Sequence, residues 1–366
     1  MLKLHTIGAV RGRGMSQPTI HDVAKAAGVS VTTVSHALNG KGRVDPNTRA
    51  RVAQVVHRLG YRANRHARGL RMGRSGSLGL LLPVSGDARS DETLRLDFYM
   101  RLAGAAAATA FSRDNALMLL PPVIVGAGLR GLAIDGGIVA DPSPDDKRVR
   151  ALEDLGLPVV TIGRGLGRPD YPWYVASETD ANTRLMLDHL AAHGARRIAL
   201  LTPRADWGWA TETLAAYESW TSEHGLPQLT VPVAMRPGEQ SAFRAARRLL
   251  AAKTPPDAIF AVAERFIRGV LRAASACGQQ VPGELLLAAG VDGAEAREGD
   301  PPVSALELHP ERQAEAAVEL LLARLSGDQA PAPTYIPATL HVRASTGAPH
   351  HPRPGRPALT SAPAAI

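Results

Sequence analysis

The sequence predicts a small all-α head followed by a larger α/β body, whose parallel strands form two lobes. Residues 19–72 contain short amphipathic stretches with clear signals for helix start and stop. From about residue 77, short apolar runs alternate with helical stretches, a pattern typical of parallel sheets. The chain has 366 residues. The roughly 270 residues after the head are too many for one small sheet, which indicates two α/β halves.

The charges are distributed unevenly along the chain. Residues 1–74 hold 14 lysines and arginines against two acidic residues, a net charge of +12, whereas the rest of the chain carries −4. This asymmetry predicts that the head binds a polyanion, with a merely solvated basic tail as the alternative.

Composition excludes several classes of protein. No apolar stretch approaches the roughly 18–20 residues of a membrane span, and the N-terminus lacks the apolar core of a signal peptide. Cys277 is the single cysteine, which rules out an intrachain disulfide and any cysteine-based zinc site. We therefore expect a soluble, cytoplasmic protein without a metal or a cofactor.

The first two expected helices of the head are short and close together. Residues 20–27 form the first, with Thr19 as the capping residue and Gly28 as a left-handed stop. Ser30 can cap the second, over residues 31–38, which Asn-Gly then ends.

The third expected helix covers residues 46–59, with Asp45 as N-cap, proline at its first position and Gly60 after its end. Apolar side chains at helical spacing can share one small core. They are Val23, Ala27, Val34, Leu38, Val52, Val55 and Leu59.

The spacing of Ala24, Gly28 and Val34 indicates a helix-turn-helix, because two helices that cross closely need a small residue and a tight turn. The outer face of the second helix would then enter the major groove of DNA. That face carries Val31, Thr32, Thr33, Ser35, His36 and Asn39. A purely structural helical hairpin is the alternative.

In the body, alternation predicts seven strands and six helices. The strands are Leu78–Leu82, Ala116–Leu120, Gly137–Ala140, Val159–Ile162, Ile198–Leu201, Ala258–Val262 and Leu285–Ala289. The helices are Phe98–Phe111, Lys147–Leu155, Asn182–His193, Thr211–His224, Ala242–Ala252 and Arg265–Ala276.

Two patterns suggest other chemistry. Gly126, Gly128 and Gly131 follow an apolar run, and Asp141 ends the next strand, which allows a nucleotide-dependent enzyme as an alternative function. His189 and His193 have the spacing of metal ligands, but no third ligand is evident and a solvated helix end is the simpler interpretation. No catalytic residue is predicted.

Several segments resemble the LacI/GalR family of bacterial repressors. They are residues 19–40, 44–49, 59–70, 163–164, 189–201, 290–292 and 336–345. The resemblance covers about residues 18–346 and is most specific in the first 55 residues. It implies a dimeric transcription repressor that is controlled by an effector and binds a palindromic operator on double-stranded DNA.

The resemblance also implies a hinge helix over Asn64–Leu70, which forms in the minor groove and inserts Leu70 between base steps. The expected DNA-contacting residues are Thr19, Ser30, Val31, Thr32, Thr33, Ser35, His36 and Asn39 in the head, and Asn64, Ala67, Arg68, Leu70 and Arg71 in the hinge.

For the body, the resemblance implies a periplasmic-binding-protein fold with a ligand cleft between its lobes. Effector contacts are expected from Phe98, Tyr99, Trp207, Trp209, Thr211 and Asp292. Val262-Ala263-Glu264 replaces the Ala-Asn-Asp of sugar sensors, and Thr211 replaces an arginine. The effector is therefore left open between a sugar, another metabolite of more aromatic character, and no effector at all, in which case the protein would bind DNA constitutively.

The expected organisation has five parts. They are a flexible arm at 1–17, in which Met15 is a second candidate start, the helix-turn-helix domain at 18–63, the hinge at 64–74, the effector and dimerisation domain at 75–346, and a disordered tail at 347–366. The first lobe is expected at about 76–174 and 304–327, and the second at about 175–303 and 330–346.

Overall fold

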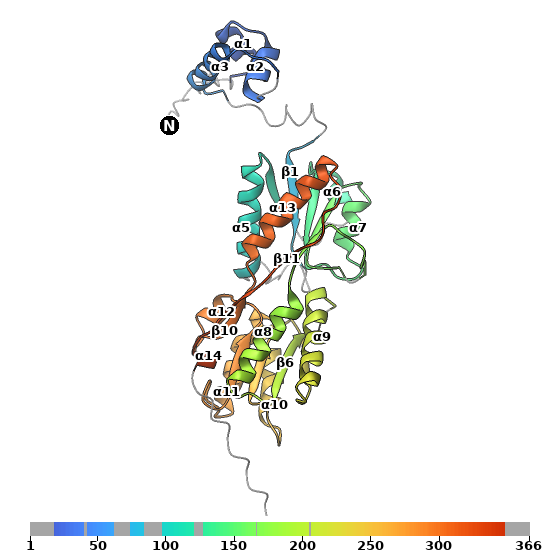
Figure 1. Cartoon of the computed structure of the whole chain (residues 1–366), viewed down its shortest axis with the longest axis vertical. Coiled ribbons are helices and arrows are strands. Elements are labelled where there is room, and N and C mark those ends of the chain that lie inside the picture. The colour runs from blue at the N-terminus through green and yellow to red at the C-terminus, as the bar shows by residue number, and fades with distance from the viewer. Residues whose placement is uncertain are drawn as a thin grey trace, which may run out of the picture. The chain divides into compact units, whose positions relative to one another are not determined.

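The computed structural model describes residues 18–39, 42–61, 74–83, 97–120, 127–165, 167–204 and 206–347. Residues 1–75 and residues 76–366 form two compact units (Figure 1). The expected N-terminal arm, the C-terminal tail beyond residue 347 and the hinge residues Asn64, Ala67, Arg68, Leu70 and Arg71 lie outside the described residues.

The first unit contains the three expected helices, α1 (Ile20–Ala27), α2 (Val31–Asn39) and α3 (Pro46–Leu59). Their boundaries follow from capping. The Thr19 hydroxyl accepts a hydrogen bond from the backbone N–H of Asp22, whose carboxylate accepts from the N–H of Thr19 at 2.8 Å. Gly28 and Gly60 end α1 and α3 with φ of 63° and 62°, a region that glycine adopts without strain.

Six residues form the buried core of this unit, which confirms the predicted packing at Val23, Val34 and Val52. The complete set is Val23, Ala24, Ala27, Val34, Val52 and Val55. The prediction for Leu38 was wrong, since 36% of its surface is exposed. The buried stripe of α2 runs through Val31, Val34 and Ala37, in steps of three residues, so Leu38 lies beside it.

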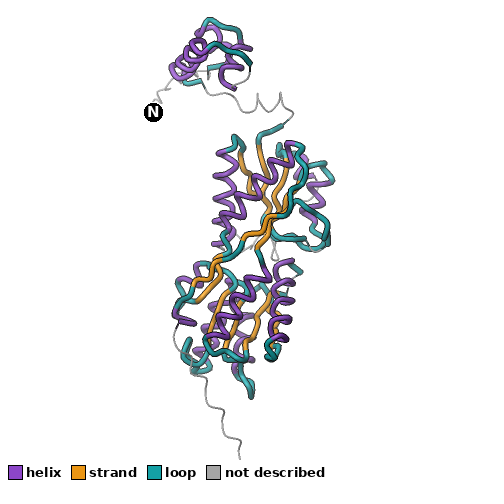
Figure 2. Tube along the Cα trace, viewed as in Figure 1, coloured by secondary structure: helices purple, strands orange, loops and turns teal. Residues whose placement is uncertain are grey.

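The second unit contains two six-stranded sheets, which confirms the predicted two-lobed α/β class (Figure 2). The first sheet has the order β11-β5-β4-β3-β1-β2, and all its neighbouring strands are parallel. The strands are β1 (Ser77–Leu81), β2 (Ala116–Leu120), β3 (Gly136–Ala140), β4 (Val159–Ile162), β5 (Tyr174–Ser177) and β11 (Thr334–Ile336).

The second sheet has the order β12-β10-β9-β8-β6-β7 and is parallel except for the β10–β12 pair. Its strands are β6 (Ile198–Pro203), β7 (Leu229–Val233), β8 (Ala258–Ala261), β9 (Leu286–Ala289), β10 (Ser304–Glu307) and β12 (Thr339–His341). All seven predicted strands are present. The sequence analysis missed β5, β7, β10, β11 and β12.

Helices cover both faces of each sheet (Figure 1). In the first lobe, α5 (Asp97–Ser112) and α13 (Pro310–Ser326) pack on one face and α7 (Lys147–Glu153) on the other. In the second lobe, α10 (Gly238–Leu250) and α11 (Ile267–Ala276) cover one face, while α8 (Thr179–Ala192) and α9 (Gly208–Glu223) cover the opposite one.

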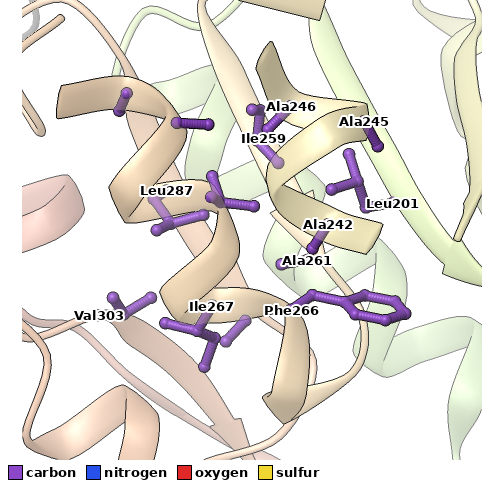
Figure 3. Close-up of a cluster of buried hydrophobic side chains, with 14 of the residues drawn as sticks. Leu201, Ala242, Ala245, Ala246, Ile259, Ala261, Phe266, Ile267, Leu287 and Val303 are labelled. Atoms are coloured by element: carbon purple, nitrogen blue, oxygen red, sulfur yellow. The ribbon is translucent and has the colours of Figure 1, made fainter. Parts of the chain in front are cut away.

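The contact between α10 and α11 is close enough to require glycine. A Cβ atom added at Gly269 would lie 2.3 Å from the carbonyl oxygen of Glu239. Small side chains from α10, among them Ala242, Ala245 and Ala246, and larger ones such as Phe266 and Ile267 fill the space beneath (Figure 3). This packing fixes the position of the loops at the end of β8.

The chain passes between the two sheets after β5, after β10 and between β11 and β12. The expected lobe limits differ from these crossings. Residues 304–307, expected in the first lobe, pair in the second sheet as β10, and residues 334–336, expected in the second lobe, pair in the first sheet as β11. β5 also pairs in the first sheet, across the expected limit at residue 174. These memberships depend on pairing between distant strands, which local sequence patterns do not encode.

Candidate functional site

The first candidate site is the outer face of α2 in the first unit. Thr32 and His36 are exposed on it, and Val31, Thr33 and Ser35 are half-buried. Ser30 caps the helix, because its hydroxyl accepts from the backbone N–H of Thr33 at 3.0 Å. Asn39 ends the helix, and its side chain lies outside the described residues.

Among the described helices of this unit, α2 is the one whose N-terminal end has no acidic residue in its cap or first turn. Asp22 and Asp45, the acidic residues of the described part of this unit, serve α1 and α3. A backbone hydrogen bond from Thr19 is the main cause that lowers the pKa of Asp22, so it remains charged there. The dipole of α2 and the backbone N–H groups of its first turn can therefore attract an anion such as a phosphate.

The second candidate site is a cleft between the two lobes, at the carboxyl ends of their parallel strands, where ligands bind in open α/β sheets. It encloses about 1160 Å³ of space including its open mouth. Its walls come from loops after β1, β3 and β4, from the first turns of α5, α8 and α9, and from the ends of β8, β9 and β10.

Four aromatic side chains line this cleft in two pairs. Phe98 and Tyr99 begin α5 and meet edge to face, with ring centroids 5.2 Å apart. Trp207 and Trp209 flank the start of α9, with centroids 5.6 Å apart and planes inclined by 24°. The structure thus brings together four of the six residues expected to contact an effector.

The other two expected effector residues are placed elsewhere. Thr211 is exposed on α9 and is not part of the lining, whereas Glu212 and Thr213 are. The backbone around Asp292 approaches the cleft through Gly290 and Val291, but the carboxylate of Asp292 is not part of the lining either.

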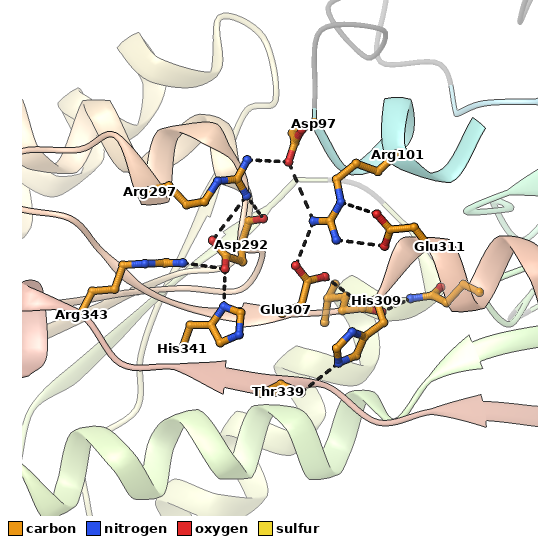
Figure 4. Close-up of polar contacts among 12 residues, drawn as sticks. Asp97, Arg101, Asp292, Arg297, Glu307, His309, Glu311, Thr339, His341 and Arg343 are labelled. Carbon is orange, nitrogen blue, oxygen red and sulfur yellow. Dashed lines mark hydrogen bonds and ion pairs between the residues drawn. The ribbon is translucent and has the colours of Figure 1, made fainter. Parts of the chain in front are cut away.

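The carboxylate of Asp292 is instead bound by basic side chains of the second lobe (Figure 4). Its Oδ2 accepts from Arg343 at 2.7 Å and from His341 at 2.6 Å, and Arg297 lies 3.7 Å from its Oδ1. Burial acts to raise the pKa of Asp292, but these two hydrogen bonds outweigh it and the pKa is lowered. A direct ligand contact by Asp292 would require these partners to be displaced.

Sequence reasoning missed Asp141 as a cleft residue and assigned it to a nucleotide motif. It directly follows β3 and has φ of 44°, a strained value for a residue with a side chain. Tyr99 donates a hydrogen bond of 2.5 Å to its Oδ2, and Arg148 donates to its backbone carbonyl at 3.1 Å. An aspartate at the end of a buried parallel strand was the signal that could have placed it here.

The Asp141 carboxyl is unusually easy to protonate. Burial raises its pKa to about 6, although the hydrogen bond from Tyr99 and the charge of Arg148 act in the opposite direction. The same burial and the neighbouring carboxylate raise the pKa of Tyr99, which keeps the phenol as the donor.

We predict that Asp141→Asn stabilises the protein at about pH 7.5 by about 1–2 kcal/mol and has little effect at about pH 4. A carboxyl whose pKa is raised on folding binds its proton more tightly in the folded state. Stability therefore falls as pH rises from the unfolded value towards 6, and the penalty persists above it. Urea unfolding of both proteins at the two pH values measures this, with the exposed Asp170→Asn as the matched control. An equal shift at both pH values would contradict the assignment.

Two alternative sites find little support. Gly128 lies within the four-residue helix α6 (Ala127–Arg130) and Gly131 directly follows it, and this helix is too short to present a diphosphate at its N-terminus. Gly126 lies outside the described residues. The ring nitrogens of His189 and His193 bind the hydroxyl of Thr346 and the carbonyl of His189. Within the described segments, no group of three potential ligands could hold a metal ion.

Two family models match parts of this chain. Residues 19–64 match the family model "Bacterial regulatory proteins, lacI family", and residues 187–346 match "Periplasmic binding protein-like domain". The regulator AglR of Rhizobium meliloti (strain 1021) is 30% identical over 297 residues, which cover 75% of this chain and 77% of AglR. The chain belongs to the lacI family. It is thus a DNA-binding transcriptional regulator with a helix-turn-helix domain and an effector-binding domain.

Other members of the family are also similar over most of their length. The regulator CelR of Thermobifida fusca is 27% identical over 85% of this chain and 93% of its own. A structure described as a CelR–cellobiose complex has a TM-score of 0.67 and 26% identity over 90% of this chain and 99% of that chain. The lac repressor dimer bound to operator shares the fold, with a TM-score of 0.71, 21% identity and coverage of 91% and 100%.

No helix in the described parts of this lacI-family regulator is both long and apolar enough to cross a membrane.

Proposed function

We propose that this protein is a repressor that binds a palindromic operator as a dimer, with an affinity set by a small molecule in the interlobe cleft. The observation that carries the proposal is the exposed N-terminal turn of α2, without an acidic residue, on a unit whose sequence has a net charge of +12. Such a helix end suits phosphates, and short polar side chains such as Thr32 and His36 suit base edges. The other expected DNA contacts, including the hinge, belong to the same proposal.

The dimer is supported by exposed apolar side chains of the first lobe. Phe111 near the end of α5 is 67% exposed, and Leu119 on β2 is 45% exposed. β2 is the terminal strand of the first sheet, so among the described residues its outer edge has no neighbouring strand. A second copy of the chain that covers this region would give each operator half-site its own head.

The effector is supported by the form of the cleft. Aromatic faces and buried carboxylates are the groups with which proteins bind ring-shaped polar molecules, and the CelR structure is described as a complex with cellobiose. We therefore place a saccharide-sized ring compound first among candidate effectors. The relatives AglR and CelR are described as transcriptional regulators, so we assign no catalytic step to this protein. Because it binds chromosomal DNA, we place it in the cytoplasm.

Selection of operators from random DNA, followed by binding curves at several salt concentrations, tests this function. We expect a palindromic consensus, two chains bound for each operator, and a loss of affinity of about 10³-fold between about 50 and 200 mM salt. The physical reason is that cationic side chains release counterions when they neutralise several phosphates. A salt-independent affinity, or tight binding by a monomer, would contradict the proposal.

A further inference from the structure

Five charged residues line the cleft, three of them acidic and two of them arginines. Arg164 forms an ion pair of 2.7 Å with Glu212. Arg265 donates from Nη1 to the carbonyl of Met235 at 3.2 Å, towards the loop that precedes α10. Asp141 and Glu264 make no ion pair with a basic side chain within the part of the chain that the structure describes.

Glu264 is the more deeply buried of these two acids. The residue is 6% exposed and begins the 3-10 turn Glu264–Phe266, separated by two residues from the end of β8. Oε1 accepts from the backbone N–H of Glu295 at 3.3 Å, whereas Oε2 has no hydrogen-bond partner among the described residues. Gly293 allows this close packing, because a Cβ atom there would lie 2.0 Å from Oε1.

The surroundings of Glu264 favour a positive charge nearby. Burial raises its pKa, and the carboxylate of Asp97 adds to that effect, while Arg297 opposes it. Glu295 is another neighbouring acid. Burial raises its pKa and Glu264 adds to that effect, while Arg268, 3.9 Å from its Oε1, acts to lower it. Of the five charged residues that line the cleft, three are acidic and two are arginines, so the lining as a whole has one more acidic than basic group.

Asp141 presents a second acceptor on the opposite lobe. Tyr99 occupies its Oδ2, and its Oδ1 lies beside Gly163, where a Cβ atom would be 3.4 Å from that oxygen. No hydrogen bond to Oδ1 is present within the described residues. A carboxylate held in this way by a phenol can accept one further donor from a ligand.

We propose that the effector carries a protonated amine on a ring-sized body, held between the two tryptophans and the carboxylates of Asp141 and Glu264. A carboxylate that is buried without a partner is unfavourable unless a cation or several donors reach it. Aromatic faces attract the same cations electrostatically, above all the faces of tryptophan. The inference rests on the proposed function, since it identifies the chemical class of ligand for that cleft.

Matched pairs of probes test the proposal with the full-length protein. Each pair contains a neutral and a cationic compound of similar shape: glucose and glucosamine, cellobiose and the disaccharide of chitosan, 2-phenylethanol and phenethylamine. The two sugar pairs test whether the ligand is an amino sugar, and the third pair tests whether it is an aromatic amine. Tryptophan fluorescence reports binding, because Trp207 and Trp209 line the cleft.

In at least one pair we expect the cationic compound to bind at least about tenfold more tightly at about pH 7.5. The preference should decrease below about pH 6, where Asp141 becomes protonated. It should disappear in the double variant Asp141→Asn, Glu264→Gln and persist in Glu315→Gln, an exposed acid-to-amide change on α13.

The proposal is overturned if no cationic compound binds in the millimolar range, or if every neutral compound binds as tightly as its partner. It is also overturned if the double variant keeps the preference while its thermal unfolding shows that it is folded. If only neutral compounds bind and change operator affinity, the proposed repressor function stands and only the proposal of a protonated amine fails.

Discussion

Thr32→Asp is expected to reduce operator affinity by at least about 100-fold while the head stays folded. Thr32 lies exposed in the first turn of α2, and the structure shows no side-chain hydrogen bond to it. An aspartate at that position suits the helix dipole, so the helix itself is not destabilised. When the helix lies against DNA, however, the aspartate repels the phosphates that the N-terminal end of the helix should attract.

Thr32→Asn separates charge from shape in this experiment. Asparagine has nearly the shape of aspartate and can hydrogen-bond to bases, so we expect a loss of about tenfold or less, with altered base preference. Fluorescence anisotropy on the selected operator gives both affinities, and circular dichroism checks the fold. Equal losses for the two variants would show that charge at this end of α2 is unimportant, and unchanged affinity in Thr32→Asp would remove α2 as the reading helix.

Trp220→Ala is expected to lower the free energy of unfolding of the second unit by about 3–5 kcal/mol. Trp220 on α9 is 1% exposed and belongs to the core between α8, α9 and the second sheet. Its indole N–H donates to Asp188 on α8 at 2.7 Å, and its ring stacks on His224 with centroids 4.1 Å apart. The truncation therefore leaves a large cavity and also removes a buried donor.

Trp220→Phe is the matched control, because it keeps much of the packing and removes the indole N–H. We expect it to lower stability by about 1–2 kcal/mol, mainly through the smaller ring, because Asp188 is exposed and its carboxylate can accept from water instead. Urea unfolding followed by far-ultraviolet circular dichroism measures both, with the linear slope as a check on two-state behaviour. A loss below about 1 kcal/mol for Trp220→Ala would show that the core relaxes around the site.

The sequence determined the elements whose signals are local. Thr19, Gly28, Ser30 and Asp45 are adjacent to the helix ends that they create, so the three helices of the head could be predicted almost to the residue. The seven strands found from sequence are apolar runs between helices, and most of them are buried along their length. Membership of the lacI family also follows from such segments, because the recognition motif is continuous in the chain.

The tertiary structure decided what depends on contacts between distant residues. β10 was expected in the first lobe but pairs in the second sheet, and β11 was expected in the second lobe but pairs in the first sheet. Pairing between distant strands decides this membership. Asp292 binds Arg343 and His341, and Asp141 faces the cleft with Tyr99, through neighbours 42 to 51 positions away in the chain. Which carboxylate is held by cations and which remains available for a ligand is a property of the folded arrangement. Local sequence patterns carry no information on it, since they specify where a carboxylate occurs and not which side chains surround it.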